Sequence, residues 1–269
     1  MVKIKNKTIF TGKIKLLSGL HIGSGKMSLE TDATVMKDAF DKPYIPGSSL
    51  KGVLRAVSER LHHLVLTNNS VPVCFLAEND CNQGEASKEL QEKLQPLIRD
   101  GKENEVNNEI DQNICPICQL YGSTFRASKI VVHDGTLTKN NDSKIHSTVR
   151  HSVKIDRDTG AAKDGAKFDY EVVHAGEEFD FMIEGENLST QDEKLLYLAI
   201  HELVNGNIQL GGKISRGLGS VQLVDAKVKT YHFDHSDDKK AYLKSLINKK
   251  HEGAIKVDDN KFNIIFELV

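Results

Sequence analysis

The chain has 269 residues and nearly balanced charge, with 36 lysines and arginines against 38 acidic residues and a formal net charge of −2. Its contents of 39% hydrophobic and 28% charged residues exclude collagen-like, coiled-coil and largely disordered proteins. No run approaches the roughly 18 apolar residues that a membrane span needs, and the lysine-rich start lacks the apolar run of a secretory signal. We expect a cytoplasmic protein with no membrane partner.

The first part of the chain contains a predicted strand, a glycine-dense turn and a helix. Residues 8–17 alternate between polar and apolar and predict a strand, which leads into the turn at 18–25. A loop then reaches Asp32, before a short predicted strand over 33–37. Apolar residues at helical spacing predict a helix over 50–61 with a serine as its N-cap.

The rest of the chain contains a predicted insertion and a long polar segment. Residues 71–114 are predicted as an insertion, helical over 87–99. Residues 138–167 are polar and charged, with a predicted turn at 158–160. A polar segment of this length inside a compact domain is usually either functional or disordered. The other expected elements are strands at 128–133, 168–173, 178–184, 221–224 and 262–269 and a helix at 192–203. Two β–α–β passages predict an α+β fold with an RRM-like (ferredoxin-like) core, whose sheet holds both glycine-rich segments.

Charge is distributed unevenly along the chain. Between Glu85 and Asp111, eight acidic and four basic residues give a net charge of −4, which is typical of a solvated helical face. Between Lys144 and Lys167, six basic and three acidic residues give a net charge of +3. This basic segment could follow a phosphate backbone, whereas the near-zero total argues against a freestanding non-specific nucleic-acid binder.

The four cysteines lie within 45 positions of one another. Cys115 and Cys118 form a C-x2-C pair, and Cys74 and Cys81 form a wider pair before it. Four thiolates suit a structural tetrahedral zinc site and leave no open position for catalysis. The alternatives are buried unliganded thiols and a redox pair, and no thioredoxin-like strand–helix unit surrounds the motif to favour the latter.

The segment Gly211–Gly219 has the composition of a phosphate-binding loop. Its four glycines allow close backbone approach, and Lys213, Ser215 and Arg216 supply donors. It is neither a P-loop nor a dinucleotide fingerprint, because a predicted strand and not a helix follows it. The alternative is a glycine-bearing hairpin with solvated charges.

A second candidate anion site is the helix start at Pro46–Gly52. Free amides at a helix N-terminus attract anions, and Lys51 and Arg55 lie one turn apart on this helix. The alternative is an ordinary N-cap with basic side chains on the surface.

Five strings occur in order along the chain: GLHIGSG, YIPGSSLKGVLRAVSERL, CPICQLYGS, KIDRDTGAA with KFDYEVVHAGEEF, and LGGKISRGLGSVQL. Together they resemble the RAMP superfamily of type III CRISPR effector complexes, most of all its repeated backbone subunit of the Csm/Cmr kind. The resemblance spans roughly residues 8–225, and the tail beyond Lys229 matches no pattern. Tyr121 departs from the family, whose members often have phenylalanine there.

The resemblance implies an RRM-like core that polymerises along a CRISPR RNA. Each subunit would hold a few nucleotides, and a β-hairpin thumb, here at about 133–167, would push between bases. The chain has no tryptophan and only 6% aromatic residues, so recognition of backbone and shape is expected more than base stacking. The RNA-binding positions carried over by motif are His21, Ser48, Ser49, Lys51, Arg55, Ser123, Gly212, Lys213, Ser215 and Arg216.

The resemblance also implies a catalytic role for Asp32, in the string TDATVMKD. The implied activity is an endoribonuclease that cleaves target RNA by attack of the ribose 2′-OH on the adjacent phosphate. A distorted nucleotide supplies in-line geometry, and magnesium or another divalent cation relieves the developing charge. Asp32 would hold the cation or assist deprotonation, and the sequence does not separate these roles.

Three functional hypotheses follow. The first is an antiviral effector subunit that binds CRISPR RNA and cleaves complementary target RNA, with the large, small and neighbouring backbone subunits as partners. The second is a purely structural RNA-binding subunit, in which Asp32 is only a solvated loop carboxylate. The third is a CRISPR RNA-processing endoribonuclease, a class that shares the glycine-rich loop but commonly uses a catalytic histidine and lacks the PGSSLKG helix.

The expected organisation is a single domain over 1–269 with three additions. These are a cysteine-bearing insertion at 71–118 stapled by zinc, the thumb-like insertion at 133–167, and a lysine-rich C-terminal extension at 226–269.

Overall fold

The computed structural model describes residues 3–29, 31–66, 72–74, 81, 84–138, 146–248 and 254–257. Its strands are β1 (Asn6–Leu16), β2 (Ile130–Val132), β3 (Ser147–Ile155), β4 (Ala162–Val173), β5 (Glu178–Glu186), β6 (Val221–His232) and β7 (Ile255–Lys256). Its helices are α1 (Gly47–Leu61), α2 (Gly84–Arg99), α3 (Glu103–Asn113), α4 (Pro116–Tyr121), α5 (Thr190–Val204) and α6 (Ser236–Asn248), with 3-10 turns η1 (His62–Leu64) and η3 (Ile214–Arg216). This is the α+β class that the sequence predicts.

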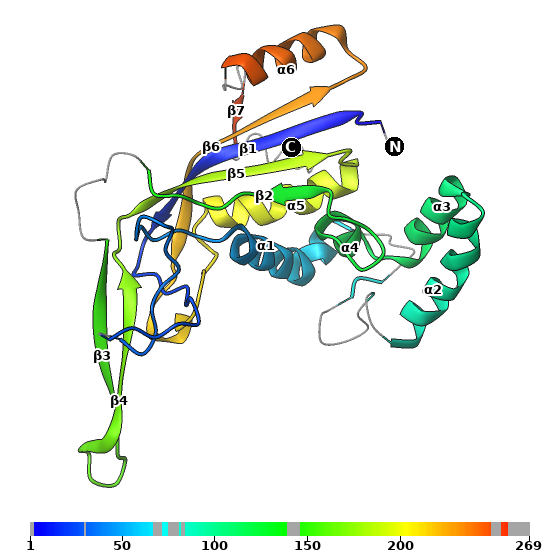
Figure 1. Cartoon of the computed structure of the whole chain (residues 1–269). Coiled ribbons are helices and arrows are strands. Elements are labelled where there is room, and N and C mark those ends of the chain that lie inside the picture. The colour runs from blue at the N-terminus through cyan, green and yellow to red at the C-terminus, as the bar shows by residue number, and fades with distance from the viewer. Residues whose placement is uncertain are drawn as a thin grey trace.

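Five strands form one antiparallel sheet in the order β2-β5-β1-β6-β7 (Figure 1). The central strand β1 pairs with β5 on one side and β6 on the other. Leu16, the last residue of β1, lies opposite Val221, the first residue of β6. The glycine-rich segments that follow β1 and precede β6 therefore belong to one sheet, as predicted, and the structure further places them at the same end of it.

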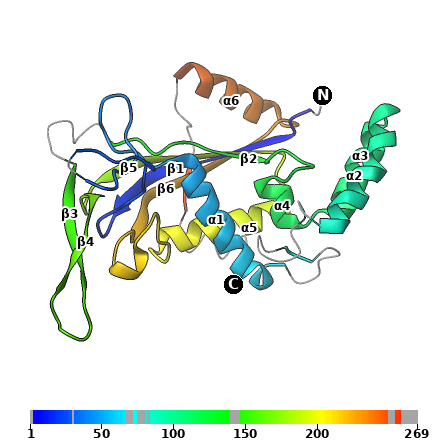
Figure 2. The ribbon, with the colours of Figure 1, turned by 60° about the horizontal axis from the view of Figure 1, so that its bottom comes forward.

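The core lies between this sheet and helices α1 and α5, which cover one face; α6 lies on the side of the strands away from them (Figure 2). Phe10 and Ile14 of β1 are fully buried, and the ring of Phe10 lies edge-on to Tyr197 of α5 at a centroid distance of 5.0 Å. Leu50 and Leu54 of α1 are also buried. Their helical spacing lets one face of α1 enter the core.

Strands β3 and β4 form a separate two-stranded hairpin that projects away from the body (Figure 1). Its turn is built on Asp156, whose carboxylate accepts hydrogen bonds from the backbone of Asp158 and Thr159. The tip of the hairpin is exposed, and its base is buried at Tyr170–Val173. The turn expected at 158–160 is confirmed. Residues 168–173, expected as a separate strand, form the half of β4 that lies nearest the body of the molecule.

Helices α2 and α3 pack on each other at the end of the molecule opposite the hairpin (Figures 1 and 2). The sequence predicts α2 but not α3, whose apolar residues are only Val106 and Ile110. Two such residues are too few for a periodic pattern, and α3 forms because it has α2 beside it. The acidic surplus of 85–111 lies largely on exposed positions of these two helices.

Several local expectations are wrong. Residues 33–37 are extended but form only isolated bridges and no strand. Neither serine at the start of α1 caps it, because the helix begins earlier, at Gly47, whose N–H donates to the Asp134 carboxylate at 2.7 Å. The sequence also missed α4 and α6. The strand expected at 262–269 lies outside the described residues, and within the described ranges no helix is both long and apolar enough to cross a membrane.

Candidate nucleic-acid interface

The two glycine-rich segments contact each other directly at the end of the sheet. The N–H of Gly212 donates to the carbonyl of His21, and the N–H of Gly219 donates to the carbonyl of Gly19, both at 2.8 Å. Glycine is needed at the closest approaches: a Cβ on Gly211 would lie 2.4 Å from the His21 carbonyl oxygen, and one on Gly219 would lie 2.1 Å from that of Leu210. Both also have positive φ.

Basic and aromatic side chains gather where this glycine-rich loop meets the base of the hairpin. The ammonium of Lys213 lies 4.3 Å from the ring centroid of Tyr170, and the guanidinium of Arg216 lies 5.3 Å from that of Phe168. The two rings stack at 6.2 Å. Cation–π contacts of this kind hold both cations beside the hairpin.

His21 is buried between the two structures. Its Nδ1 lies 2.7 Å from the Glu171 carbonyl oxygen, so this nitrogen is the donor, and its ring packs edge-on to Tyr170. Only 7% of the residue is exposed. His21 therefore ties the glycine-rich loop to the hairpin, and its Nε2 is the atom left for a ligand.

Asp32 lies on an exposed loop along the outer edge of β4. Its carboxylate Oδ2 accepts a hydrogen bond from the backbone N–H of Asp169 at 2.8 Å, and the neighbouring Ala33 bridges to Tyr170. The structure thus brings Asp32, His21 and the loop at 212–216 together around the base of one hairpin.

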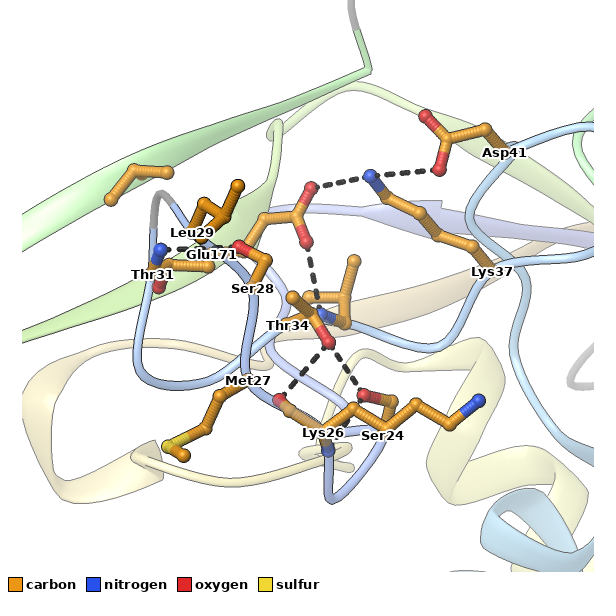
Figure 3. A pocket seen from close by; sticks show the side chains of 12 residues that line it. Ser24, Lys26, Met27, Ser28, Leu29, Thr31, Thr34, Lys37, Asp41 and Glu171 are labelled. Atoms are coloured by element: carbon orange, nitrogen blue, oxygen red, sulfur yellow. Dashed lines mark hydrogen bonds and ion pairs between the residues drawn. The ribbon is translucent and has the colours of Figure 1, made fainter.

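A cavity of about 640 Å³ opens beside this loop (Figure 3). Glu171 is the anchor on its wall: its carboxylate accepts from the backbone N–H of Val35 at 3.1 Å and from the Ser147 hydroxyl at 2.6 Å. It also pairs with Lys37 at 2.9 Å. Burial opposes ionisation of Glu171, but these hydrogen bonds outweigh burial and hold its pKa below the usual value. The remaining lining residues are Ser24, Lys26, Met27, Ser28, Leu29, Thr31, Thr34, Asp41 and Val149.

The start of α1 presents a lysine with two serines. Ser48 is exposed and Ser49 half-buried, and neither hydroxyl is used as a cap. Burial and the neighbouring charge of Arg55 lower the pKa of Lys51. An anion bound here would favour the charged form of Lys51 and offset the effects of burial and of Arg55.

Arg55 and Ser123, two further predicted RNA contacts, are engaged inside the protein. The Arg55 guanidinium pairs with Glu59 at 2.8 Å and donates to the Gly122 carbonyl and the Cys118 Sγ, both at 3.2 Å. Burial disfavours the charge of Arg55, but its interactions with Glu59 and Cys118 together outweigh burial and raise the pKa of Arg55. The Ser123 hydroxyl accepts backbone hydrogen bonds within its own turn.

The four cysteines converge, with their sulfur atoms within 4.8 Å of one another. The Cys74 sulfur lies 3.6 Å from that of Cys115 and 3.3 Å from that of Cys118, near the roughly 3.8 Å that ligands of a tetrahedral zinc would show. Hydrogen bonds from the other thiols, Cys118 first, lower the pKa of Cys115. This donor set could hold a metal such as zinc, and the cluster lies at α4, away from the hairpin.

Sequence reasoning missed Phe168, Tyr170, Glu171, His151 and Asp169, the hairpin residues that build the site. The only available signal was the alternation of β4, where Phe168 and Tyr170 face the glycine-rich loop while Asp169 and Glu171 face the other way. That alternation does not show which face of β4 meets the glycine-rich loop and which meets the Asp32 loop, because both loops are distant in sequence and only the fold brings them to β4.

The α+β fold with its antiparallel sheet is compatible with a RAMP protein, and the chain belongs to the RAMP superfamily, whose family model matches residues 13–222. Three curated relatives have the name "CRISPR system Cms endoribonuclease Csm3". The protein from Methanocaldococcus jannaschii is 28% identical over 252 residues, covering 88% of each chain. The one from Enterococcus italicus is 26% identical over 243 residues, covering 86% of this chain and 97% of its own. The one from Methanothermobacter thermautotrophicus is 40% identical over 62 residues, 22% of this chain and 25% of its own. The resemblance seen in the motifs is confirmed.

Proposed function

We propose that this chain is a backbone subunit of a type III CRISPR effector complex, which binds CRISPR RNA and cleaves complementary target RNA at Asp32. One observation carries the proposal: an exposed carboxylate is held at the base of a basic hairpin, beside a glycine-rich loop with Lys213 and Arg216. The similarity to proteins named endoribonuclease supports it. The partners are the two RNAs and the large, small and neighbouring backbone subunits, in the cytoplasm.

The guide strand would be held by its phosphates and not by its bases. Lys51 with Ser48 and Ser49 offers one anion site, and the loop at Gly212, Lys213, Ser215 and Arg216 with His21 offers another. A protein that accepts guides of any sequence must bind features common to all of them, which are backbone and shape. Because the Arg55 guanidinium and the Ser123 hydroxyl already have protein partners, we assign them to support of the first site.

The hairpin of β3 and β4 would be the thumb that distorts the bound strand. Distortion brings a ribose 2′-OH in line with its own phosphodiester, and attack then forms a 2′,3′-cyclic phosphate and releases a 5′-hydroxyl. Asp32 takes up the 2′-hydroxyl proton or holds a divalent cation such as magnesium, which neutralises the developing charge. The loop around Asp32 is anchored by Glu171 and Lys37, so the carboxylate approaches the RNA from a fixed position.

We further propose an RRM-like core and a structural zinc. The order β2-β5-β1-β6, with α1 after β1 and α5 after β5, supports the split β–α–β arrangement of ferredoxin-like folds. The geometry of the cysteines supports zinc at Cys74, Cys81, Cys115 and Cys118. Arg55, which donates to Cys118, would orient a zinc ligand from outside the coordination shell.

The test of the main proposal is Asp32→Ala in the complex assembled with guide RNA. Target cleavage should fall by roughly 100-fold or more, while the complex keeps its CRISPR RNA. Asp100→Ala, which removes an exposed aspartate after α2, is the matched control and should cleave normally. Unchanged cleavage by Asp32→Ala would instead make the chain a purely structural RNA-binding subunit.

A further inference from the structure

One face of the hairpin carries titratable groups that the proposed mechanism does not yet use. Val149 lies opposite Glu171, and His151 lies opposite Asp169 two residues nearer the tip. Because side chains in a strand alternate, all four share one face, and the pair Val149 and Glu171 lines the cavity. His151 and Asp169 therefore extend the cavity wall toward the tip of the hairpin.

His151 is positioned by a carboxylate. Its Nδ1 lies 2.8 Å from Asp169 Oδ1, a buried oxygen that has no hydrogen-bond partner among the described residues. A buried carboxylate oxygen needs a donor, and a small rotation of the ring provides one in Nδ1–H. With Nδ1 protonated toward Asp169, the other nitrogen, Nε2, is the one that exchanges a proton with a substrate.

The same aspartate joins His151 to Asp32. The backbone N–H of Asp169 donates to Asp32, while its side chain contacts His151 on one oxygen and Lys167 at 3.6 Å on the other. The His151 side chain is 64% exposed, so an RNA strand lying along this face reaches it. The charged groups on the face of this imidazole are Asp169 and Lys167 from β4, with Asp32 on the adjoining loop. Arg150, the next residue on β3, points to the opposite face because side chains alternate along a strand.

We propose that His151 is the general acid of target-RNA cleavage, which rests on the proposed function of Asp32. As the 2′ oxygen forms its bond to phosphorus, the bond from phosphorus to the 5′ oxygen breaks and its electron pair stays on that oxygen. His151 Nε2 gives its proton to the 5′ oxygen, which leaves as a hydroxyl. The proton of the 2′-OH passes to Asp32, and solvent then returns His151 and Asp32 to their starting states. Asp169 is the positioning residue that holds the donor form of the ring.

The experiment compares two targets in the assembled complex, one natural and one with a 5′-bridging phosphorothiolate at the cleaved linkage. A thiolate leaves without a proton, because thiols are far more acidic than alcohols. His151→Gln should cleave the natural target roughly 100-fold more slowly and the sulfur target within about threefold of the wild-type rate. Asp169→Asn should show a smaller loss with the same rescue, and it provides the comparison should His151→Gln fail to assemble.

The matched control is His235→Gln, since His235 is another exposed histidine beside an aspartate, 3.6 Å from Asp234, far from the hairpin. It should cleave both targets normally. The inference is overturned if His151→Gln cleaves the natural target at the wild-type rate, or if its defect is equal on both targets. Asp32→Ala separates the two proposals: it should stay inactive on both targets, and normal cleavage by it would refute the proposed function whatever His151 does.

Discussion

At the scale of single residues, the site depends on a few positions where one atom decides the geometry. Glu171 connects the Asp32 loop to the hairpin through Val35, Lys37 and Ser147. The glycine-rich loop connects to its neighbours through backbone contacts that leave no room for a Cβ. Both kinds of contact can be removed by a change of a few atoms, which makes them testable.

Glu171→Gln should destabilise the folded chain by about 2 kcal/mol at pH 7, because it replaces a charged acceptor oxygen, which two or three donors face, by an uncharged NH2 group. The lowered pKa of Glu171 means that its stabilisation is complete above the ordinary pKa of about 4.5 and is lost as pH falls through the folded-state value. The difference in unfolding free energy between wild type and variant should therefore disappear in acid. Urea unfolding at several pH values measures it.

The control for this prediction is Glu178→Gln. Glu178 pairs with Lys13 at 3.3 Å, and both side chains are about a third exposed, so the change should cost less than about 1 kcal/mol. Equal effects of the two substitutions would contradict the anchoring role of Glu171.

A pair of glycine substitutions isolates the tight contact in the loop. Gly219 and Gly217 have nearly the same positive φ, 85° and 80°, so alanine strains the backbone by about 1 kcal/mol at either. Only Gly219→Ala also collides with the Leu210 carbonyl. It should cost about 3 kcal/mol or more against about 1 kcal/mol for Gly217→Ala, measured by urea unfolding. Similar costs would mean that the loop shifts to accept the methyl group.

At the scale of elements, the hairpin is the piece that serves two purposes. Its base packs against the glycine-rich loop through Phe168 and Tyr170, and its other face carries Glu171 and Asp169. Its tip contacts little and is almost wholly exposed. Basic side chains near the tip can therefore be substituted without lowering the stability of the folded chain, which separates a role in RNA binding from a role in folding.

Removal of three basic residues near the tip should weaken RNA binding without destabilising the fold. The substitutions are Lys154→Ala, Arg157→Ala and Lys163→Ala. Removing one cation that binds a phosphate should reduce the salt slope of single-stranded RNA binding by about 0.7, so the triple variant should have a slope smaller by about 2. Binding at several salt concentrations measures it. The control triple lies on α2 and consists of Lys88→Ala, Lys93→Ala and Arg99→Ala; the same slope in both would contradict a role for the tip.

At the scale of the whole molecule, charge is separated between the two ends. The basic hairpin projects from one end and the acidic pair α2 and α3 from the other (Figure 1). A chain of net charge −2 therefore presents a basic surface at the hairpin, as the proposed function requires. Within the described residues, α2 and α3 pack mainly on each other, and the cysteine cluster lies where they approach α4. A metal there would hold the acidic end to the core.

Loss of that metal should loosen the acidic end while the sheet stays folded. Purified protein should contain about one zinc per chain, and Cys115→Ser with Cys118→Ser should contain none. Limited proteolysis should then cut the double variant within 84–113 and spare the sheet, because the sheet and α1 have their own core. Asn107→Ser with Asn108→Ser, on exposed positions of α3, is the control. If wild-type protein that contained no metal resisted proteolysis within 84–113, a metal would not be what holds α2 and α3 to the core.

The sequence by itself determined the elements with a regular pattern. The strands β1 and β5 and the helices α1, α2 and α5 were predicted because their apolar residues repeat with the period of a strand or helix. The glycine-rich loop and the four cysteines stand out by residue types that suit phosphate and metal binding, whereas Asp32 is singled out only by the resemblance to the RAMP superfamily. The helices α3, α4 and α6 were missed, since short or polar helices are stabilised by neighbours and not by their own pattern.

Only the tertiary structure decided which of these residues work together. It placed the hairpin of β3 and β4 beside the Asp32 loop, so that Asp169, more than a hundred positions from Asp32, lies next to it. It also directed Arg55 toward Glu59 and Cys118, although its spacing from Lys51 suggested a surface cation. The physical reason is that hydrogen bonds and ion pairs depend on distances in space, whereas the periodicity of a sequence reports only on neighbours along the chain.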